Sequence, residues 1–327
     1  MHVKIALAGA YLRAGNYEES IRLFKEVIAK QPRNASAYAN LGLAYGGKGH
    51  WKEEIENYKK AISLNPKDRV AHYNLASAYE KRNQDMDALR EYEAVLKIDP
   101  ADLDARKKLA DFDFRNKRYS EAIKAYEKLL ISIPKNPSIH ANLGFAYGEL
   151  KKYKQSSEHY EKAIKYGIKD PKVRYNLAYT YDRLGRKKDA IREYEHIASS
   201  GPNMEVLDIL AEYYTDEKQY ENAIKTYKRM IAINSKRAVA YSGLGYVYGL
   251  RNDTDKEIEY YRVSLKYDRE NDDVYLSLGK AYEKKGMYQD AINAYTQAYE
   301  LNPDSGVAAR KIPALKIKML QEKHQES

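Results

Sequence analysis

The feature that most constrains this chain is a residue pattern that returns every 34 residues. Residues 35–68 read ASAYANLGLAYGGKGHWKEEIENYKKAISLNPKD, and one period later the same residue kinds return as Leu75, Ala76, Tyr79 and Tyr92. A period of this length is typical of units of two helices, which cannot bury their apolar faces singly and therefore stack. The sequence predicts an all-α solenoid, which grows by adding units and needs no single central core.

The period divides residues 1–305 into nine predicted units, of which the sixth is one residue short. Position 7 of every unit is Leu, position 8 is Gly or Ala, and position 24 is aromatic. Positions 4, 7, 8 and 11 share one stripe of a first helix, and positions 20, 24 and 27 share one stripe of a second. We expect these stripes to face each other, with small residues at positions 8 and 20. The predicted units are 1–34, 35–68, 69–102, 103–136, 137–170, 171–203, 204–237, 238–271 and 272–305.

The ends of the predicted helices carry their own signals. Position 32 is Pro in six units, which ends the second helix before the next unit begins. Position 15 should end the first helix in a left-handed conformation, because it is often a residue that tolerates one. These residues are Gly15, Gly49, Asn83, Gly185, Asn252 and Gly286.

The repeated residues resemble the tetratricopeptide repeat family over residues 1–305. The resemblance implies a right-handed superhelical solenoid of antiparallel helix pairs, with the first helices lining a concave groove. Members of this family are mostly scaffolds that hold extended peptides or partner helices. Residues 306–327 leave the pattern but keep Ile312, Leu315 and Met319 at helical spacing. We expect a C-terminal capping helix there, with Pro313 in its first turn or at a kink; a basic amphipathic helix that binds a membrane surface or a partner is the alternative.

Positions 2, 5, 6, 9, 12 and 13 of the first helices should face the groove. Position 6 carries a series of asparagines, interrupted by Lys108, and an amide both donates to and accepts from a peptide backbone. The series is similar to the asparagine ladder of O-GlcNAc transferases; the other interpretation is that it only solvates the groove. These asparagines are Asn40, Asn74, Asn142 and Asn176. The tyrosines outside the packing positions, which should also line the groove, are Tyr73, Tyr175, Tyr179 and Tyr246.

Charged residues give the predicted groove a changing sign. Some family members clamp a peptide carboxylate, and the resemblance would place Lys107, Asn142 and Lys172 in such a clamp. Asp111 and Asn176 stand where that clamp needs Asn and Arg, and an Asp repels a carboxylate. Lys107, Lys108 and Lys172 are therefore expected only to attract an acidic segment. In the seventh unit Asp208 and Glu212, with Glu205 and Asp216, make the groove acidic, which predicts a ligand of matching charge order.

Other kinds of chemistry find little support in the sequence. The absence of Cys excludes disulfides, Cys-ligated zinc and thiol catalysis. Residues 42–49 nearly spell a phosphate-binding loop, but Gly49 replaces the Ser or Thr after Lys48, and no strand precedes it. The seven His form no metal-binding pair, and no carboxylates stand out for acid–base work. We therefore predict no enzyme, no cofactor and no metal.

We predict a non-enzymatic scaffold that binds an extended protein segment in its groove. The alternatives are a scaffold segment of a bacterial export or polysaccharide-secretion assembly, and the substrate-guiding domain of an enzyme whose catalytic part is absent. The net charge of +10 favours acidic partners, although we expect no specific nucleic acid and no membrane insertion. A soluble protein of the cytoplasm or the periplasm is expected. The partner, the oligomeric state and any longer parent chain are not readable from these residues.

Overall fold

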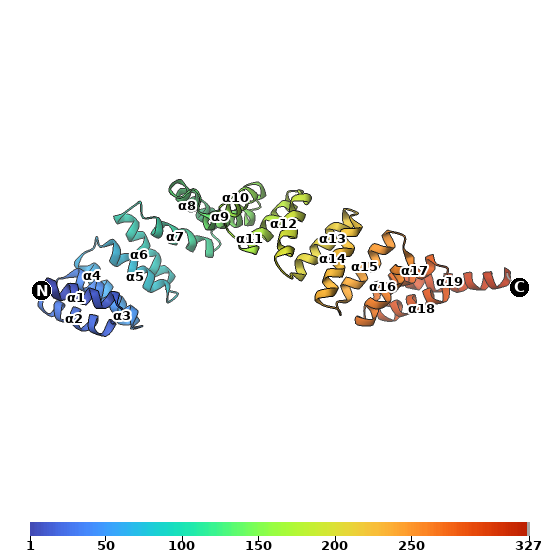
Figure 1. The fold of residues 1–327 in the computed structure, drawn as a ribbon, viewed down its shortest axis with the longest axis horizontal. Helices are drawn as coiled ribbons and strands as arrows, with labels where there is room; N and C mark the ends of the chain where they lie inside the picture. Colours follow the sequence, from blue (N-terminus) through green and yellow to red (C-terminus); the bar gives the residue numbers. More distant parts are fainter. Residues whose placement is uncertain (326–327) are drawn as a thin grey trace. The chain divides into compact units, whose positions relative to one another are not determined.

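The computed structural model describes residues 1–325, and over this range the chain forms nineteen α-helices joined by short turns (Figure 1). The chain divides into two compact units, Met1–Thr180 and Tyr181–Ser327, and the division falls inside α11. From here on, the first and the second unit are these two parts of the chain, and every other unit is one of the nine repeats of about 34 residues. In the first unit the helices are α1 (His2–Arg13), α2 (Tyr17–Lys30), α3 (Ala35–Gly47), α4 (Trp51–Leu64), α5 (Arg69–Glu80), α6 (Asp85–Ile98), α7 (Leu103–Arg115), α8 (Tyr119–Ser132), α9 (Pro137–Glu149), α10 (Tyr153–Lys165) and the start of α11 (Pro171–Arg183). The others are α12 (Lys187–Ser200), α13 (Met204–Asp216), α14 (Tyr220–Ile233), α15 (Ala238–Leu250), α16 (Thr254–Tyr267), α17 (Asp272–Lys284), α18 (Tyr288–Leu301) and α19 (Gly306–Gln325).

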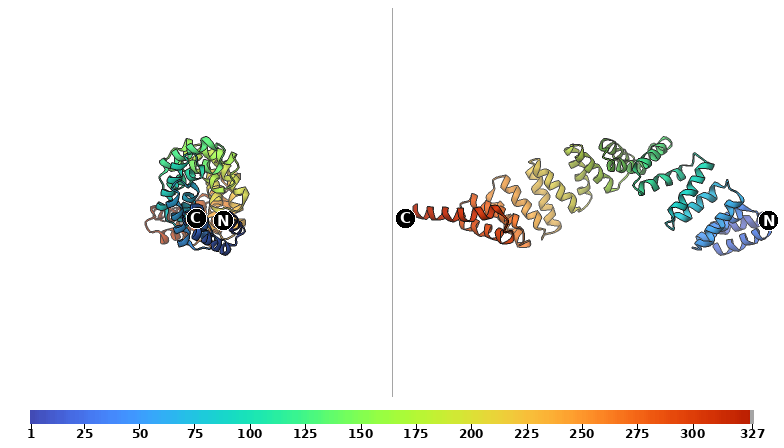
Figure 2. Two further views of the ribbon diagram at one scale, coloured as in Figure 1. Left: turned by 90° about the vertical axis from the view of Figure 1, so that its left-hand side faces the viewer. Right: turned by 180° about the vertical axis from the view of Figure 1, so that it is seen from behind.

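Within each unit, helices that follow one another in the chain pack together, as α1–α2 and α7–α8 do in the first unit and α13–α14 does in the second. In the first unit the pairs α3–α4, α5–α6 and α9–α10 pack closely, and in the second unit α15–α16 and α17–α18 do the same. Neighbouring pairs also lie against one another, through α2–α3, α4–α5 and α6–α7 in the first unit and through α14–α15 and α16–α17 in the second, as the further views of each unit show (Figure 2). The predicted all-α solenoid of helix pairs is confirmed.

The turn between paired helices has one backbone conformation throughout. Position 15 has a positive φ, between 57° and 81°, in all nine predicted units. The prediction of a left-handed residue at the Gly and Asn positions is confirmed. Three units place a lysine there instead, although a side chain disfavours this conformation. These lysines are Lys117, Lys151 and Lys218.

The core is built from aromatic rings that lie against small residues. A Cβ added to Gly144 would lie 2.7 Å from the Tyr160 ring, and one added to Gly279 would lie 2.8 Å from the Tyr295 ring. Position 8 must therefore be small because the position-24 ring of the same unit occupies the adjacent space. The expectation of small residues at position 20 is wrong in two units: Glu54 and Glu257 stand there, buried, with their carboxyl groups over a glycine of the first helix.

The first helices begin with a cap that the sequence reasoning did not single out. Position 34 is often Asn or Asp, and its side chain accepts a hydrogen bond from the backbone N–H three residues later. The caps at Asn34, Asp68, Asp102, Asn136 and Asn271 share this geometry. The units that follow these caps therefore start at a satisfied helix terminus, whereas Arg237, which precedes α15, makes no such side-chain bond.

The last helix, α19, packs on α18. Ala308 and Leu315 are buried there, and Ile312 and Met319 are partly buried. Pro313 lies inside the helix and not in its first turn. Residues 326 and 327, which belong to the predicted tail, lie outside the described residues. Over the described part of the chain, no helix combines the length and apolar character that a membrane crossing requires.

Candidate functional site

The candidate binding surface is the exposed side of the first helices, which we call the first-helix face. It carries residues from positions 5, 6, 9, 12 and 13, and three cavities open on it. One of about 500 Å³ is lined by α1, α3 and the end of α5, one of about 260 Å³ by α9, α10 and α11, and one of about 370 Å³ by α13, α14 and α15. The first two belong to the first unit and the third to the second unit.

The position-6 asparagines lie half-buried on this face, and tyrosine hydroxyls of the preceding second helices orient two of them. Asn142 Nδ2 donates to the Tyr126 hydroxyl at 3.0 Å, and Asn176 hydrogen-bonds Tyr160. Asn40 instead donates to the Ser36 carbonyl at 2.8 Å. The preceding unit has Phe24 at position 24, so no hydroxyl is available to Asn40. Because Asn142 uses its N–H₂ group to donate to a tyrosine, its side-chain carbonyl oxygen is still able to accept a hydrogen bond.

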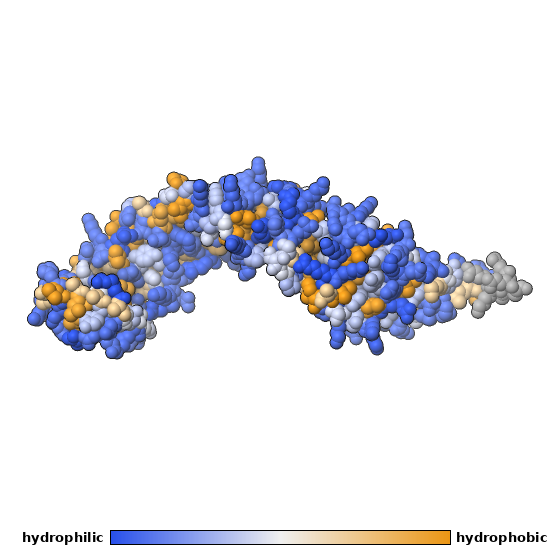
Figure 3. Space-filling model, viewed as in Figure 1, coloured by the Kyte–Doolittle hydropathy of each residue, from blue (hydrophilic) through white to orange (hydrophobic). Residues whose placement is uncertain are grey.

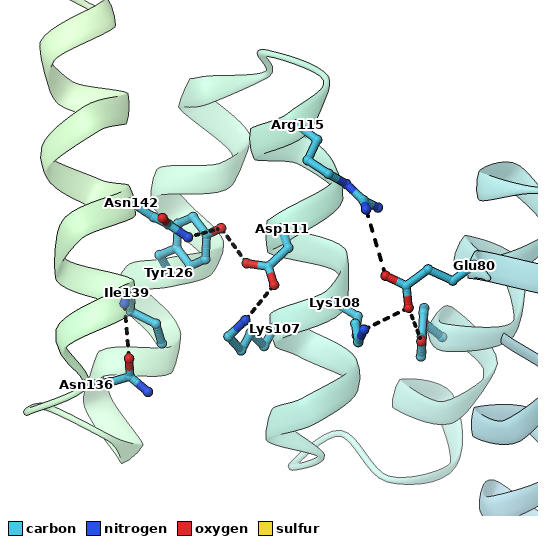
Figure 4. A network of polar contacts seen from close by, with 10 residues as sticks. Glu80, Lys107, Lys108, Asp111, Arg115, Tyr126, Asn136, Ile139 and Asn142 are labelled. Atoms are coloured by element: carbon cyan, nitrogen blue, oxygen red, sulfur yellow. Dashed lines mark hydrogen bonds and ion pairs between the residues drawn. The ribbon is translucent and has the colours of Figure 1, made fainter. Parts of the chain in front are cut away.

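A polar network connects α5, α7, α8 and α9 in the first unit (Figure 4). The Tyr126 hydroxyl donates to Asp111 at 2.6 Å, and Lys107 Nζ lies 2.6 Å from the same carboxyl group. Burial, with the neighbouring Asp111 carboxylate, raises the pKa of Tyr126, so its hydroxyl stays a donor.

The lysines of this network are held within the molecule. Lys108 Nζ lies 2.7 Å from Glu80, which also accepts from Tyr92 at 3.0 Å and has Arg115 3.9 Å away. These bonds lower the pKa of Glu80 against the opposing effect of burial. Lys107 and Lys108, expected to attract an acidic segment, are therefore each neutralised by a carboxylate, so this part of the face carries little net charge.

The remaining predicted residues of the first unit lie on α5 and α11. Tyr73 packs edge-on against Tyr92, with 5.4 Å between ring centroids. Lys172 is exposed in the first turn of α11 and Tyr175 is half-buried. Tyr179 is 51% exposed and lines the α9–α11 cavity beside Asn176. This cavity therefore offers an aromatic surface next to an amide.

The cavity of the second unit brings together Asp208, Glu212 and Tyr246, three of the residues that the sequence analysis expects to face the groove. Tyr246 is 54% exposed. In the space-filling view, apolar and hydrophilic side chains lie beside one another over α13, α14 and α15 (Figure 3). Asp208 is paired with Arg237. Within the described residues, Glu212 and Asp216 have no ion pair or side-chain hydrogen bond, so the cavity keeps a negative charge.

The α1–α3–α5 cavity has the opposite sign. Arg13 and Lys81 line it together with Asn40 and the half-exposed Leu43. Its one carboxylate, Glu54, is buried and bonded to Arg82 at 3.0 Å. Lys81 and Arg13 lie 68 residues apart but occupy the same position 13 of their units, which is the signal that could have placed them here. Arg237, at position 34, was missed because its role depends on Asp208, which lies 29 residues earlier at the other end of the same unit.

The described side chains of this face offer hydrogen-bonding groups, charges and exposed aromatic rings. Among residues 1–325 no group of three or more His, Asp or Glu side chains is arranged to hold a metal ion. Two buried histidines make side-chain contacts between paired helices, His72 with Glu91 and His140 with His159. Both contacts lie away from the cavities described above.

Models of known families match most of the chain. The TPR repeat model matches residues 9–49, 48–83 and 212–252, and tetratricopeptide repeat models match residues 86–146, 137–166, 171–202 and 273–305. The chain belongs to the tetratricopeptide repeat (TPR) family. TPR proteins generally mediate protein–protein interactions.

Individual relatives of this TPR protein align with only part of it. The small glutamine-rich tetratricopeptide repeat-containing protein 2 of Mycosarcoma maydis is 33% identical over 99 residues, 30% of this chain and 28% of that protein. The uncharacterized protein ycf37 of Cyanophora paradoxa is 28% identical over 107 residues, 32% of this chain and 62% of that protein. The chain therefore spans less than two thirds of either relative.

Solved structures share the fold. The C-terminal part of a TPR repeat-containing protein from Cytophaga hutchinsonii is 18% identical, with a TM-score of 0.52 over 84% of this chain and 99% of that one. The structure of Naa15/Naa10 bound to HypK-THB gives 12% identity and a TM-score of 0.50 over 97% of this chain and 66% of that one. At these identities the likeness concerns the helical solenoid alone.

Proposed function

We propose that this TPR protein is a non-enzymatic scaffold that holds extended protein segments against its first-helix face. The observation that carries the proposal is the orientation of Asn142, whose N–H₂ group is bound to Tyr126 while its carbonyl oxygen remains as an acceptor. Asn176, bonded to Tyr160, repeats the arrangement one unit later. Two acceptors one unit apart suit the backbone N–H groups of an extended chain, with little demand on its side chains.

The nine-unit division predicted from the sequence fits this role. We propose that units 1–34 to 272–305 supply the binding face and that α19 closes the last unit by covering the apolar side of α18. Its buried Leu315 supports the capping interpretation. The groove residues predicted on the other first helices, from Asn74 to Tyr246, would contribute to the same face.

The asparagine rungs can be tested with peptides selected from a phage-displayed library of unstructured decamers on the immobilised full chain. Fluorescence anisotropy then compares the wild type with Asn142→Ala and Asn176→Ala. Loss of one backbone hydrogen bond of about 0.5–1.5 kcal/mol weakens binding roughly two- to thirteenfold. The matched control is Asn57→Ala on the second helix α4, where the side chain donates only to the Glu53 carbonyl oxygen of its own helix. Equal affinities for all four proteins would refute the proposal.

The second unit adds a preference for charge, which supports the predicted charge order of the ligand. Glu212 and Asp216 give the α13–α15 cavity an uncompensated negative charge beside the exposed Tyr246 ring. We therefore expect basic side chains to dock there, because a ring and a carboxylate together suit a long cationic chain.

A peptide of alternating Lys and Ala tests this preference. Its affinity should fall at least about threefold in Glu212→Lys, since an exposed charge pair contributes roughly 0.2–1 kcal/mol and reversal adds repulsion. Glu259→Lys, which makes the same exchange on the second helix α16, should leave the affinity unchanged. If both variants lose affinity equally, the effect is one of net charge and the docking of basic side chains in this cavity is wrong.

A further inference from the structure

Two histidines in the fifth predicted unit meet nitrogen to nitrogen. His140 Nδ1 of α9 lies 3.0 Å from His159 Nδ1 of α10, while the ring centroids are 5.2 Å apart. A short N···N distance with a wide centroid separation places the rings end to end and not face to face. The contact is therefore a single N–H···N hydrogen bond, in which one imidazole nitrogen donates and the other accepts.

A second hydrogen bond fixes which histidine carries the shared proton. His140 Nε2 lies 3.0 Å from the Pro134 carbonyl oxygen in the turn after α8, and a carbonyl can only accept. His140 Nε2 therefore carries a proton, and in the neutral ring its Nδ1 is the acceptor. His159 Nδ1 must be the donor. A second proton on His140 would bring two N–H groups face to face at this distance.

The surroundings of the pair offer little to balance a new charge. His140 is 3% exposed and has the Tyr166 ring 5.3 Å away, and the Tyr147 ring stacks on His159 at 5.5 Å. The carboxylate facing from α8, Glu127, is engaged by the Tyr147 hydroxyl at 2.5 Å. Lys162 of α10 acts on both rings and opposes their protonation.

The third predicted unit contains the same arrangement with one residue changed. His72 occupies the position of His140, and its Nε2 lies 3.2 Å from the Pro66 carbonyl. Its Nδ1, however, lies 2.6 Å from Glu91, which occupies the position of His159. A carboxylate can bond a charged imidazole as well as a neutral one. The third unit thus pairs this histidine with a carboxylate, where the fifth unit pairs it with a second histidine.

We propose that the His140–His159 pair is an acid-sensitive latch, which holds α9, α10 and the α8–α9 turn together when neutral and releases them when protonated. His159 precedes Tyr160, which lines the α9–α11 cavity and hydrogen-bonds Asn176. Release of α10 therefore also disturbs the binding face of this unit, a consequence that rests on the proposed function. The latch itself does not depend on it.

The direction of the pH effect follows from proton binding. Burial is the main cause that lowers the pKa of His159 from 6.5 to about 4, and it lowers the pKa of His140 as well. The opened state thus binds protons that the closed state does not, so the closed state loses stability as pH falls from about 6.5 toward 4. For His159 alone these values allow an opened fraction up to about twentyfold larger at pH 5 than at pH 7.

Hydrogen exchange on the full chain tests the latch locally. Protection factors, corrected for intrinsic exchange, should fall up to about twentyfold in α9 and α10 between pH 7 and pH 5, and change much less in α5 and α6. His159→Glu copies the third unit and should abolish the loss in α9 and α10. Glu91→His copies the fifth unit and should transfer the loss to α5 and α6.

The outcomes separate the latch from the binding proposal. Equal losses in both helix pairs of the wild type, or an unchanged loss in His159→Glu, would overturn the latch. If either variant is poorly folded at pH 7, the other substitution still tests the latch, because each substitution should move the acid-induced loss of protection in a stated direction. Affinity for a peptide selected on the first-helix face, measured at pH 7 and pH 5, tests only the consequence for binding.

Discussion

The three turn lysines give the most direct test of how the solenoid is stabilised. Lys117, Lys151 and Lys218 have φ near 58°, where the other six turns have Gly or Asn. A side chain in the left-handed region costs about 1–2 kcal/mol, and glycine removes this cost while adding about 0.5–1 kcal/mol of unfolded-state entropy. Each Lys→Gly replacement should therefore stabilise its hairpin by about 0.5–1 kcal/mol.

The best single site is Lys218, which is exposed and lines none of the three cavities on the first-helix face. Because the three turns lie in different units and share no partners, their effects should add to about 1.5–3 kcal/mol in the triple variant. Urea unfolding of the full chain, followed by circular dichroism, should show a higher midpoint for Lys218→Gly and a higher one again for the triple variant.

The reverse replacement is the control. Gly185 has φ of 73° and open space where a Cβ would stand, so Gly185→Ala introduces backbone strain without a clash. Its midpoint should fall by an amount that corresponds to about 1 kcal/mol. An unchanged or lower midpoint in the triple variant, together with a neutral Gly185→Ala, would show that the left-handed turn does not limit stability in this protein.

Two further changes test the core and the polar network. Gly144→Ala should destabilise the first unit by about 1–3 kcal/mol, because the new Cβ lies 2.7 Å from the Tyr160 ring. A Cβ at Gly148 lies no closer than 3.3 Å to its nearest neighbour, the Ser156 hydroxyl, so Gly148→Ala should stay within about 0.5 kcal/mol. Similar urea midpoints for the two variants would contradict this reasoning. Tyr126→Phe removes the hydroxyl between Asp111 and Asn142 and should cost about 1–2 kcal/mol, and an unchanged midpoint would show that water replaces both bonds.

Much of the fold was readable from the sequence because the packing of each unit is local. Leu143, Gly144 and Tyr160 lie within 18 residues of one another, and the same kinds of residue recur 34 residues on, so one unit predicts the next. The pattern did not predict that Glu54 and Glu257 would be buried at a position of small residues, because the space for their carboxyl groups comes from Gly46 and Gly249 on the facing helix.

The site was only partly predictable. The position-6 asparagines could be placed on the first-helix face from helical period alone. That Asn142 donates to Tyr126 while Asn40 turns to its own helix depends on a hydroxyl of the preceding unit, present in Tyr126 and absent in Phe24. Likewise Lys107 and Lys108 could be counted as cations, but their partners Asp111 and Glu80 are chosen by side-chain geometry.

The sequence by itself determined the helix pairs, their turns and the residues between them, because a period of 34 residues repeats the same short-range contacts. Tertiary structure decided which charges remain available and which bonds hold a proton, since these depend on side chains that meet across units or across a turn. The His72–Glu91 and His140–His159 contacts look alike in the sequence as scattered histidines. Only the folded chain brings their partners, 19 residues away, within 3.0 Å and makes one a histidine–carboxylate contact and the other a histidine–histidine contact.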